Sequence, residues 1–114
     1  MMQIETRKLD DQTCAVVISG RIMLGAESLR VEEEIAELIR QGTRRIICDL
    51  SGVTHIDSTG IGRFISSLNL AMKAGATLLM AGATGAVRQA FHITLLDTVF
   101  KFYPTLDEAR AALH

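Results

Sequence analysis

Hydrophobic and polar positions alternate along the chain with two different periods, and each period predicts one kind of element. Two short runs with strand character, residues 3–9 and 13–19, flank an acidic segment at 10–12 that suits a turn. We therefore expect the chain to open with a β-hairpin. Residues 14–18 are all apolar, which is typical of an interior strand covered on both faces.

The first helical period covers residues 26–41. Glutamates occupy much of its polar side, and its apolar positions are Leu29, Val31, Ile35, Leu38 and Ile39. Gly42 is well placed to end this helix, because glycine readily adopts the left-handed conformation found after a helix C-terminus. A strand is expected next, over the apolar residues 46–50.

A second amphipathic helix is predicted over residues 59–74, and Gly75 is expected to end it. The spacing of its apolar residues predicts a buried stripe formed by Ile61, Ile65, Leu68 and Met72. A further strand is expected over 76–81.

Three more elements complete the pattern. Thr84 is a candidate N-cap of a short helix, whose apolar residues are Val87, Ala90 and Phe91. A last strand is expected over 98–103, and Pro104 ends it. Thr105 and Glu108 form a capping-box pattern, which predicts a final short helix that closes near Leu113.

Strands that alternate with helices after an opening hairpin predict an α/β fold. We expect a mixed, mostly parallel sheet with an N-terminal hairpin, right-handed crossovers and about four helices. The 114 residues, of which 48% are hydrophobic, suit one ordinary core, so residues 1–114 are expected to form a single domain.

Charge and composition narrow the function. Twelve basic side chains nearly balance thirteen acidic ones, aromatic residues make up only 4%, and no apolar run reaches bilayer length. These features argue against nucleic-acid or membrane binding and favour protein partners. Cys14 and Cys48 lie in apolar runs without ligand spacing, so they are expected to be buried, reduced thiols in a cytoplasmic protein.

Enzyme signatures are absent from the sequence. It contains no phosphate-binding loop, no nucleophile elbow and no zinc-protease motif, and we expect no cofactor and no metal site. A serine hydrolase triad could be composed of Ser58, Asp57 and either His55 or His92. His55, however, is so near Ser58 in sequence that an imidazole oriented by Asp57 toward the hydroxyl is not expected. The histidines, His114 included, are interpreted as ordinary surface or boundary residues, and no catalytic residue is expected.

Residues 57–60, Asp-Ser-Thr-Gly, are the one stretch of chemical interest. The simplest interpretation is a helix N-cap, since Asp, Ser and Thr are preferred there. A second is a covalent switch, in which a kinase phosphorylates a hydroxyl and makes this surface strongly negative. A third is a small-molecule or nucleotide site, in which the helix start binds an anion.

Three features occur together in this sequence: the order of elements, Gly20 after the second strand, and the motif at 57–62. With them the chain resembles the STAS family, specifically the bacterial anti-sigma factor antagonists. The likeness runs from about Ile4 to Leu113. It includes residues 87–91, Leu96 and the pair at 99–100, which are similar to the family's penultimate helix and last strand.

This resemblance implies a non-enzymatic binding protein that switches partners. It implies that Ser58 is phosphorylated by an anti-sigma factor that is also a serine kinase with a histidine-kinase-like ATPase fold, and that a PP2C-type phosphatase reverses the reaction. The unphosphorylated form would bind the kinase and so release a sigma factor for transcription. Partner binding is expected at Asp57, Thr59, Gly60, Ile61, Gly62, Arg21, Ile22, Met23 and Leu24.

The resemblance also leaves an alternative, a constitutive STAS subunit of a stress-signalling or lipid-transport complex. Two stretches depart from the family pattern. Residues 21–23 read Arg-Ile-Met where relatives often have an acid, an apolar residue and an Asp. The segment 21–25 is expected to form a small extra strand or a loop. In a loop its apolar residues would be exposed and mark an interaction surface, and the alternative is that Ile22 and Leu24 pack inward. Residues 94–96 read Thr-Leu-Leu where relatives commonly have Thr or Ser, Gly and Leu, so Leu95 is expected to stiffen or expose that turn.

Overall fold

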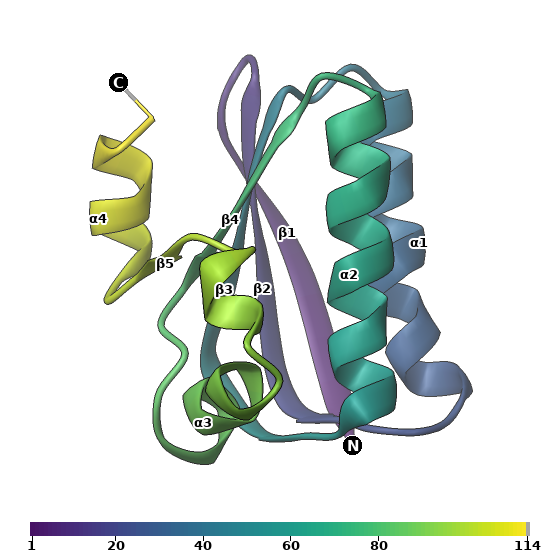
Figure 1. Cartoon of the computed structure of the whole chain (residues 1–114). Helices are drawn as coiled ribbons and strands as arrows, with labels where there is room; N and C mark the ends of the chain where they lie inside the picture. Colours follow the sequence, from purple (N-terminus) through teal and green to yellow (C-terminus); the bar gives the residue numbers. More distant parts are fainter. Residues whose placement is uncertain (114) are drawn as a thin grey trace.

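A computed structural model, which describes residues 1–113, contains one five-stranded sheet with the strands in sequence order (Figure 1). The strands are β1 (Met2–Asp10), β2 (Thr13–Ile22), β3 (Arg45–Ile56), β4 (Thr77–Ala81) and β5 (Phe102–Tyr103). β1 is antiparallel to β2, and every other neighbouring pair is parallel. The predicted α/β fold with an N-terminal hairpin is therefore confirmed.

The helices divide unequally between the two faces of the sheet. They are α1 (Ala26–Arg40), α2 (Ser58–Lys73), α3 (Gly85–Ile93) and α4 (Leu106–Ala111), with a short 3-10 turn, η1, at Leu96–Thr98. Crossovers of one hand between successive parallel strands bring their helices to the same face. Accordingly, α1, α2 and α3 share one face, whereas α4 lies on the other (Figure 1).

Alternation along the strands supplies a core to each face. Ile46 and Cys48 of β3 point into the larger core beneath α1, α2 and α3, whereas Ile47 between them points toward α4. In the smaller core Ile47 packs with Leu79, Ala81 and Ala109. α4 is also joined to the opening hairpin, because the Arg110 guanidinium donates to the Leu9 carbonyl at 2.9 Å.

The thiols of Cys14 and Cys48 are buried and unpaired, as predicted. Burial raises the pKa of the Cys48 thiol to about 12, and the nearby Asp49 carboxylate adds to this rise. The Cys48 thiol is therefore protonated at neutral pH, which agrees with a packing role.

The predicted buried stripe of α2 is partly wrong. Ile61 is buried, but the side chains that follow it into the core are Phe64, Ser67 and Ala71. Ile65 is 37% exposed and Met72 is 67% exposed. The buried Ser67 hydroxyl has a hydrogen-bond partner, because it donates to the Arg63 carbonyl at 2.8 Å.

Two strand boundaries also differ from the prediction. β3 continues past Leu50 to Ile56, because its second half pairs with β2 alone, from Ser19 opposite Gly52 to Ile22 opposite Ile56. The last strand is much shorter than 98–103 and comprises only Phe102–Tyr103, since η1 ends at Thr98 and the Phe100 side chain is buried before the strand begins. The Phe100 ring lies 5.6 Å from that of Phe91, centroid to centroid.

The predicted helix ends at Gly42 and Thr105 are confirmed, whereas Thr84 stands at the N-cap position of α3 without a capping hydrogen bond from its side chain. Gly42 has a φ of 95°, and its N–H donates to the Ile39 carbonyl at 3.0 Å. The Thr105 hydroxyl accepts the Glu108 N–H at 3.1 Å at the start of α4. Among residues 1–113, no helix is long and apolar enough to cross a membrane.

Candidate functional site

Asp57 stands between the end of β3 and the first residue of α2, and it is the N-cap of that helix. Its Oδ1 atom accepts the Gly60 N–H at 2.8 Å, which satisfies one of the free donors at the helix start. Its backbone carbonyl accepts the Ile61 N–H at 2.9 Å. The predicted helix start is thus confirmed, with the acid rather than a hydroxyl as the cap.

The other oxygen of the same carboxylate reaches a distant segment. Asp57 Oδ2 accepts the backbone N–H of Leu24 at 2.8 Å, and the Asp57 N–H donates to the Ile22 carbonyl at 3.3 Å. The N–H groups of Gly60 and Leu24 lower the pKa of the Asp57 carboxyl, with the Gly60 bond the largest cause. The carboxylate is therefore ionised at neutral pH and holds the loop after β2 against the start of α2.

Ser58 is the first residue of α2, and its side chain is exposed. A triad around it has no support, because both oxygens of Asp57 accept backbone N–H groups and the His55 Nδ1 atom lies 2.9 Å from the Thr54 hydroxyl. His92 is bound to Asp97 instead, and His114 lies outside the described residues. Ser58 is thus placed as an accessible hydroxyl and not as an activated nucleophile.

The two glycines of the motif have different surroundings. A Cβ atom on Gly60 would lie 2.2 Å from the Ile22 carbonyl oxygen, so glycine is needed for α2 to approach β2. A Cβ atom on Gly62 would meet nothing within 4 Å. Gly60 therefore serves internal packing, and Gly62 leaves open space on the surface beside Ser58.

The structure separates the expected partner-binding residues into exposed and buried ones. Ile22 is the last residue of β2 and is fully buried, and Gly60 and Ile61 are also buried, so their side chains offer no contact to a partner in this conformation. Arg21 and Leu24 are exposed, the latter by 81%, and Met23 and Thr59 are half-buried. The interpretation of 21–25 as a small extra strand is wrong, because Arg21 and Ile22 continue β2. Ile22 packs inward, and Leu24 projects from a loop as the second interpretation has it.

Arg63, which the sequence did not single out, connects this region to α1. Its Nε atom donates to the Ser28 hydroxyl at 3.2 Å, and its Nη1 atom lies 4.0 Å from the Glu32 carboxylate. The Arg63 side chain is therefore occupied in holding α2 beside α1.

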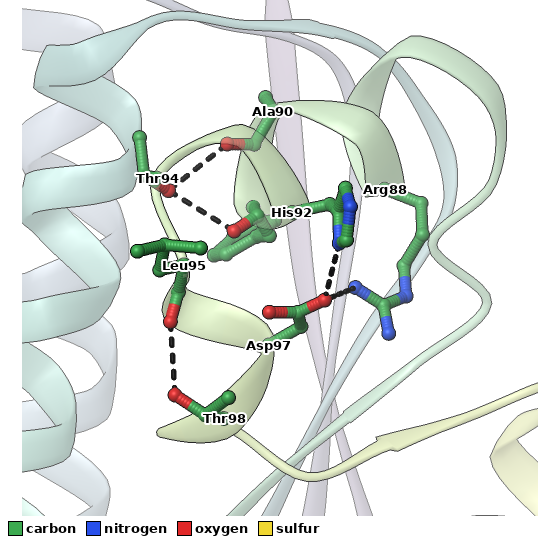
Figure 2. A network of polar contacts seen from close by, with 8 residues as sticks. Arg88, Ala90, His92, Thr94, Leu95, Asp97 and Thr98 are labelled. Carbon is green, nitrogen blue, oxygen red and sulfur yellow. Dashed lines mark hydrogen bonds and ion pairs between the residues drawn. The ribbon is translucent and has the colours of Figure 1, made fainter.

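Leu95 adopts the left-handed conformation, with φ 60° and ψ 21°, and is the one non-glycine residue with a positive φ among residues 1–113. Thr98 donates its hydroxyl to the Leu95 carbonyl (Figure 2). The Leu95 N–H donates to the His92 carbonyl. The Leu95 side chain is 71% exposed. Leu95 thus adopts, with an exposed side chain, a conformation that glycine adopts readily.

A polar cluster supports the turn around Leu95. The Asp97 carboxylate lies 2.7 Å from the His92 Nδ1 atom and 3.9 Å from the Arg88 Nη1 atom (Figure 2). The hydrogen bond with His92 is the largest cause of a lowered pKa of the Asp97 carboxyl, and the positive charge of Arg88 adds to it. The Arg88 guanidinium also lies 4.0 Å from the centre of the Phe102 ring. Charge and stacking thus hold residues 88–98 together.

Sequence comparison identifies relatives that carry the name of anti-sigma factor antagonists. An anti-sigma-B factor antagonist of Staphylococcus aureus is 31% identical over 64 residues, which are 56% of this chain and 59% of the relative. An anti-sigma factor antagonist homologue of Thermotoga neapolitana is 30% identical over 73 residues, which are 64% of this chain and 65% of the relative. The matched stretches thus span less than two thirds of these relatives.

Solved structures match over nearly the whole chain. An anti-sigma factor antagonist from Mycobacterium paratuberculosis superposes with a TM-score of 0.86 at 25% identity, covering 98% of this chain and 93% of the other. The unphosphorylated form of the Bacillus protein SpoIIAA superposes with a TM-score of 0.82 at 17% identity, covering 97% and 96%, and shares the fold. The family model of the STAS domain matches residues 3–109, and the chain therefore belongs to the STAS domain family.

Proposed function

We propose that this protein is a phosphorylation-switched anti-sigma factor antagonist with Ser58 as the phosphate acceptor. The observation that supports the proposal is that Asp57, and not Ser58, makes the side-chain contacts at the start of α2. Asp57 caps the helix and binds Leu24, so the exposed Ser58 hydroxyl is not needed for either contact. A residue that can be modified without loss of the cap suits a reversible switch.

The unphosphorylated form is proposed to bind an anti-sigma factor that is also a serine kinase, and so to free a sigma factor for transcription. Residues with accessible surface beside Ser58 are proposed to contact it: the exposed Arg21 and Leu24 and the half-buried Met23, Thr59 and Gly62. Ile22, Gly60 and Ile61 are proposed to shape this surface from below, since their side chains are buried or absent. The open space at Gly62 allows a partner to approach the first turn of α2 closely.

Phosphorylation would change the electrostatics more than the fold. The helix start tolerates an added phosphate locally, because free N–H groups and the positive end of the helix dipole lie there. The phosphate, with a charge of about −1.5 to −2, would lie beside the ionised Asp57 and make the contact surface strongly negative. Repulsion of a closely packed partner by like charge costs several kcal/mol, and every 1.4 kcal/mol is tenfold in affinity.

The relatives support this proposal. SpoIIAA, which shares the fold, has been solved in both an unphosphorylated and a phosphorylated form. The Staphylococcus aureus and Mycobacterium paratuberculosis relatives are named anti-sigma factor antagonists. A PP2C-type phosphatase is proposed to restore Ser58, and the protein itself is proposed to be a non-enzymatic cytoplasmic regulator.

The decisive test is phosphorylation of the purified protein. Incubation with ATP and the ATPase-type serine kinase encoded with this chain should add one phosphate, which peptide mass spectrometry should locate on Ser58. Thr59→Ala is the matched control and should still be modified. An unmodified wild-type protein, or phosphate on Thr59 alone, would contradict the proposal.

A second experiment separates the switch from a constitutive STAS subunit. The Ser58→Asp variant places a negative charge at the switch position and should lose the kinase in co-purification, whereas Ser58→Ala should keep it. Equal recovery of the partner with wild type, Ser58→Ala and Ser58→Asp would identify a constitutive subunit instead.

A further inference from the structure

The outer edge of β1 offers backbone hydrogen-bonding groups to another strand. In the part of the chain that the structure describes, β1 is the first strand of the sheet and pairs only with β2. It is 9 residues long, and the side chains from Glu5 to Lys8 are all exposed. A long, exposed edge strand of this kind is a template for pairing with a further strand.

The register of the hairpin shows which backbone groups point outward. The Arg21 N–H donates to the Met1 carbonyl at 3.1 Å, and the pairing that follows is regular as far as Lys8. Antiparallel partners alternate between bonded and non-bonded pairs, so odd-numbered residues of β1 bond to β2 and even-numbered ones point outward. The Met2 N–H agrees with this, since it leaves the sheet and donates to the Glu27 carboxylate at 3.0 Å. The remaining outward-pointing residues of the regular ladder are Ile4, Thr6 and Lys8.

Charged side chains are arranged symmetrically about Thr6. The Thr6 hydroxyl donates to Glu34 of α1 at 2.6 Å, so the Thr6 side chain lies on the face toward α1. Its neighbours Glu5 and Arg7 therefore point to the opposite face. There the Arg7 Nε atom lies 2.7 Å from Glu5 Oε1, and both side chains are exposed. The edge thus carries an acid on one side of Thr6 and a base on the other.

We infer that the outer edge of β1 binds the same edge of a second copy of this chain, in an antiparallel register centred on Thr6. Glu5 then lies opposite Arg7 of the second copy, so the ion pair within each chain becomes half of a ring of alternating charges. Moving the centre by one residue either way would place Glu5 opposite Glu5 or Arg7 opposite Arg7, which is unfavourable. The backbone adds about six hydrogen bonds, two from each bonded pair.

The order of charges is what selects a second copy as the partner. Charged side chains on an edge strand normally oppose pairing with other strands. Here they complement their own sequence when it runs in the opposite direction. On the face toward α1, Glu34 of each copy comes near the two-fold axis, and Lys8, which alternates onto the same face as Thr6, supplies the opposite charge. The inference goes beyond the proposed function, because Ser58 lies on α2 and not at this edge.

The first test exchanges charges at the edge. Arg7→Glu leaves two acids around Thr6, and Glu5→Arg leaves two bases, so each variant alone should self-associate about tenfold more weakly than wild type. An equimolar mixture of the two should form a heterodimer, because every acid then lies opposite a base. The double variant, Glu5→Arg with Arg7→Glu, should dimerise like wild type. Sedimentation equilibrium from micromolar to near-millimolar concentration measures each affinity.

A control variant addresses net charge. Glu33 is exposed on α1, in the groove that faces α2, so Glu33→Arg changes the charge as much as Glu5→Arg does but away from the edge. It should dimerise like wild type. Circular dichroism melts should show that all these variants stay folded, because exposed ion pairs contribute little to stability.

The second test follows the backbone. Amide hydrogens of Ile4, Thr6 and Lys8 should exchange quickly in dilute protein and several-fold more slowly at high concentration, as measured by NMR. Those of Glu5 and Arg7 bond to β2 and should be protected at both concentrations. Thr6→Pro removes the central outward N–H and should abolish dimerisation in a folded protein, since proline is tolerated where an edge N–H faces solvent. Thr6→Val keeps the N–H and should dimerise.

Each outcome decides the inference. Wild-type protein that stays monomeric at near-millimolar concentration would overturn it. So would dimerisation that Arg7→Glu and Glu5→Arg both retain, since the dimer would then use another surface. Loss of dimerisation in both variants without recovery in their mixture would overturn the register centred on Thr6, and the inference with it. Ser58→Asp should dimerise like wild type, so the edge and the switch at Ser58 can fail separately.

Discussion

The carboxylate of Asp57 binds the backbone N–H of Leu24 at 2.8 Å, across 33 positions of sequence. With its other oxygen it caps α2. One side chain therefore fixes both the exposed loop after β2 and the start of the helix that carries Ser58. Any change at Asp57 should alter the two together.

Replacement of Asp57 by alanine should lower the free energy of unfolding by about 1–2 kcal/mol, because an N-cap is lost together with the bond to Leu24. Chemical denaturation measures this change. Asp57→Asn keeps a capping oxygen and should cost less. Equal stability of wild type and Asp57→Ala would show that the cap contributes nothing.

Acid should remove the contribution of Asp57. The N–H groups of Gly60 and Leu24 lower the pKa of its carboxyl in the folded protein, so the stabilisation is fully present above the unfolded pKa of about 3.9 and is lost as pH falls through the folded value. The stability difference between wild type and Asp57→Asn should be constant from pH 5 to 7 and shrink below about pH 4. Thermal melts across this range test it, and a pH-independent difference would contradict the lowered pKa.

Gly60 and Gly62 form a matched pair for substitution by alanine. Gly60→Ala places a Cβ atom 2.2 Å from the Ile22 carbonyl oxygen and should cost about 1–3 kcal/mol or more. Gly62→Ala meets no neighbour and should stabilise α2 by about 0.5–1 kcal/mol. Under the proposed function Gly62→Ala should nevertheless weaken kinase binding. A stable Gly60→Ala variant would contradict the close approach of α2 to β2.

The two cysteines should resist alkylation in the native protein. Both thiols are buried, and the pKa of Cys48 is raised to about 12, so little thiolate exists at pH 8. Mass spectrometry after iodoacetamide treatment should show modification only when denaturant is added. Rapid labelling of Cys48 without denaturant would show that β3 opens readily.

Local patterns predicted the order of elements, the hairpin and the helix ends, because each depends on neighbouring residues. The predicted buried stripe of α2 was partly wrong because Ile65 and Phe64 both fit a helical period. Phe64 is the buried one, and its ring packs near that of Phe91 of α3. The second half of β3 pairs only with β2 and is mostly exposed, so its sequence is polar and lacks the apolar pattern of a buried strand. These outcomes depend on tertiary contacts, which periodicity does not contain.

At the candidate site, sequence pattern located Ser58 and the cap, but the bond from Asp57 to Leu24 joins segments that only the fold brings together. The burial of Ile22 was likewise invisible, since a short apolar run between glycines fits a strand end or a loop. Leu95 stands where the family pattern commonly has glycine, and the structure shows that its backbone is in the left-handed conformation that glycine adopts readily.

The short helix α4, which covers the smaller core, has a consequence for the local unfolding of the protein. α4 is six residues long and packs on the smaller core, and its bond from Arg110 to Leu9 closes a loop of 101 positions. Contacts that close so long a loop are entropically costly and form late in folding. We expect amide hydrogens of α4 to exchange through a separate, low-energy opening, while those of β2 and β3 exchange only when the whole domain unfolds.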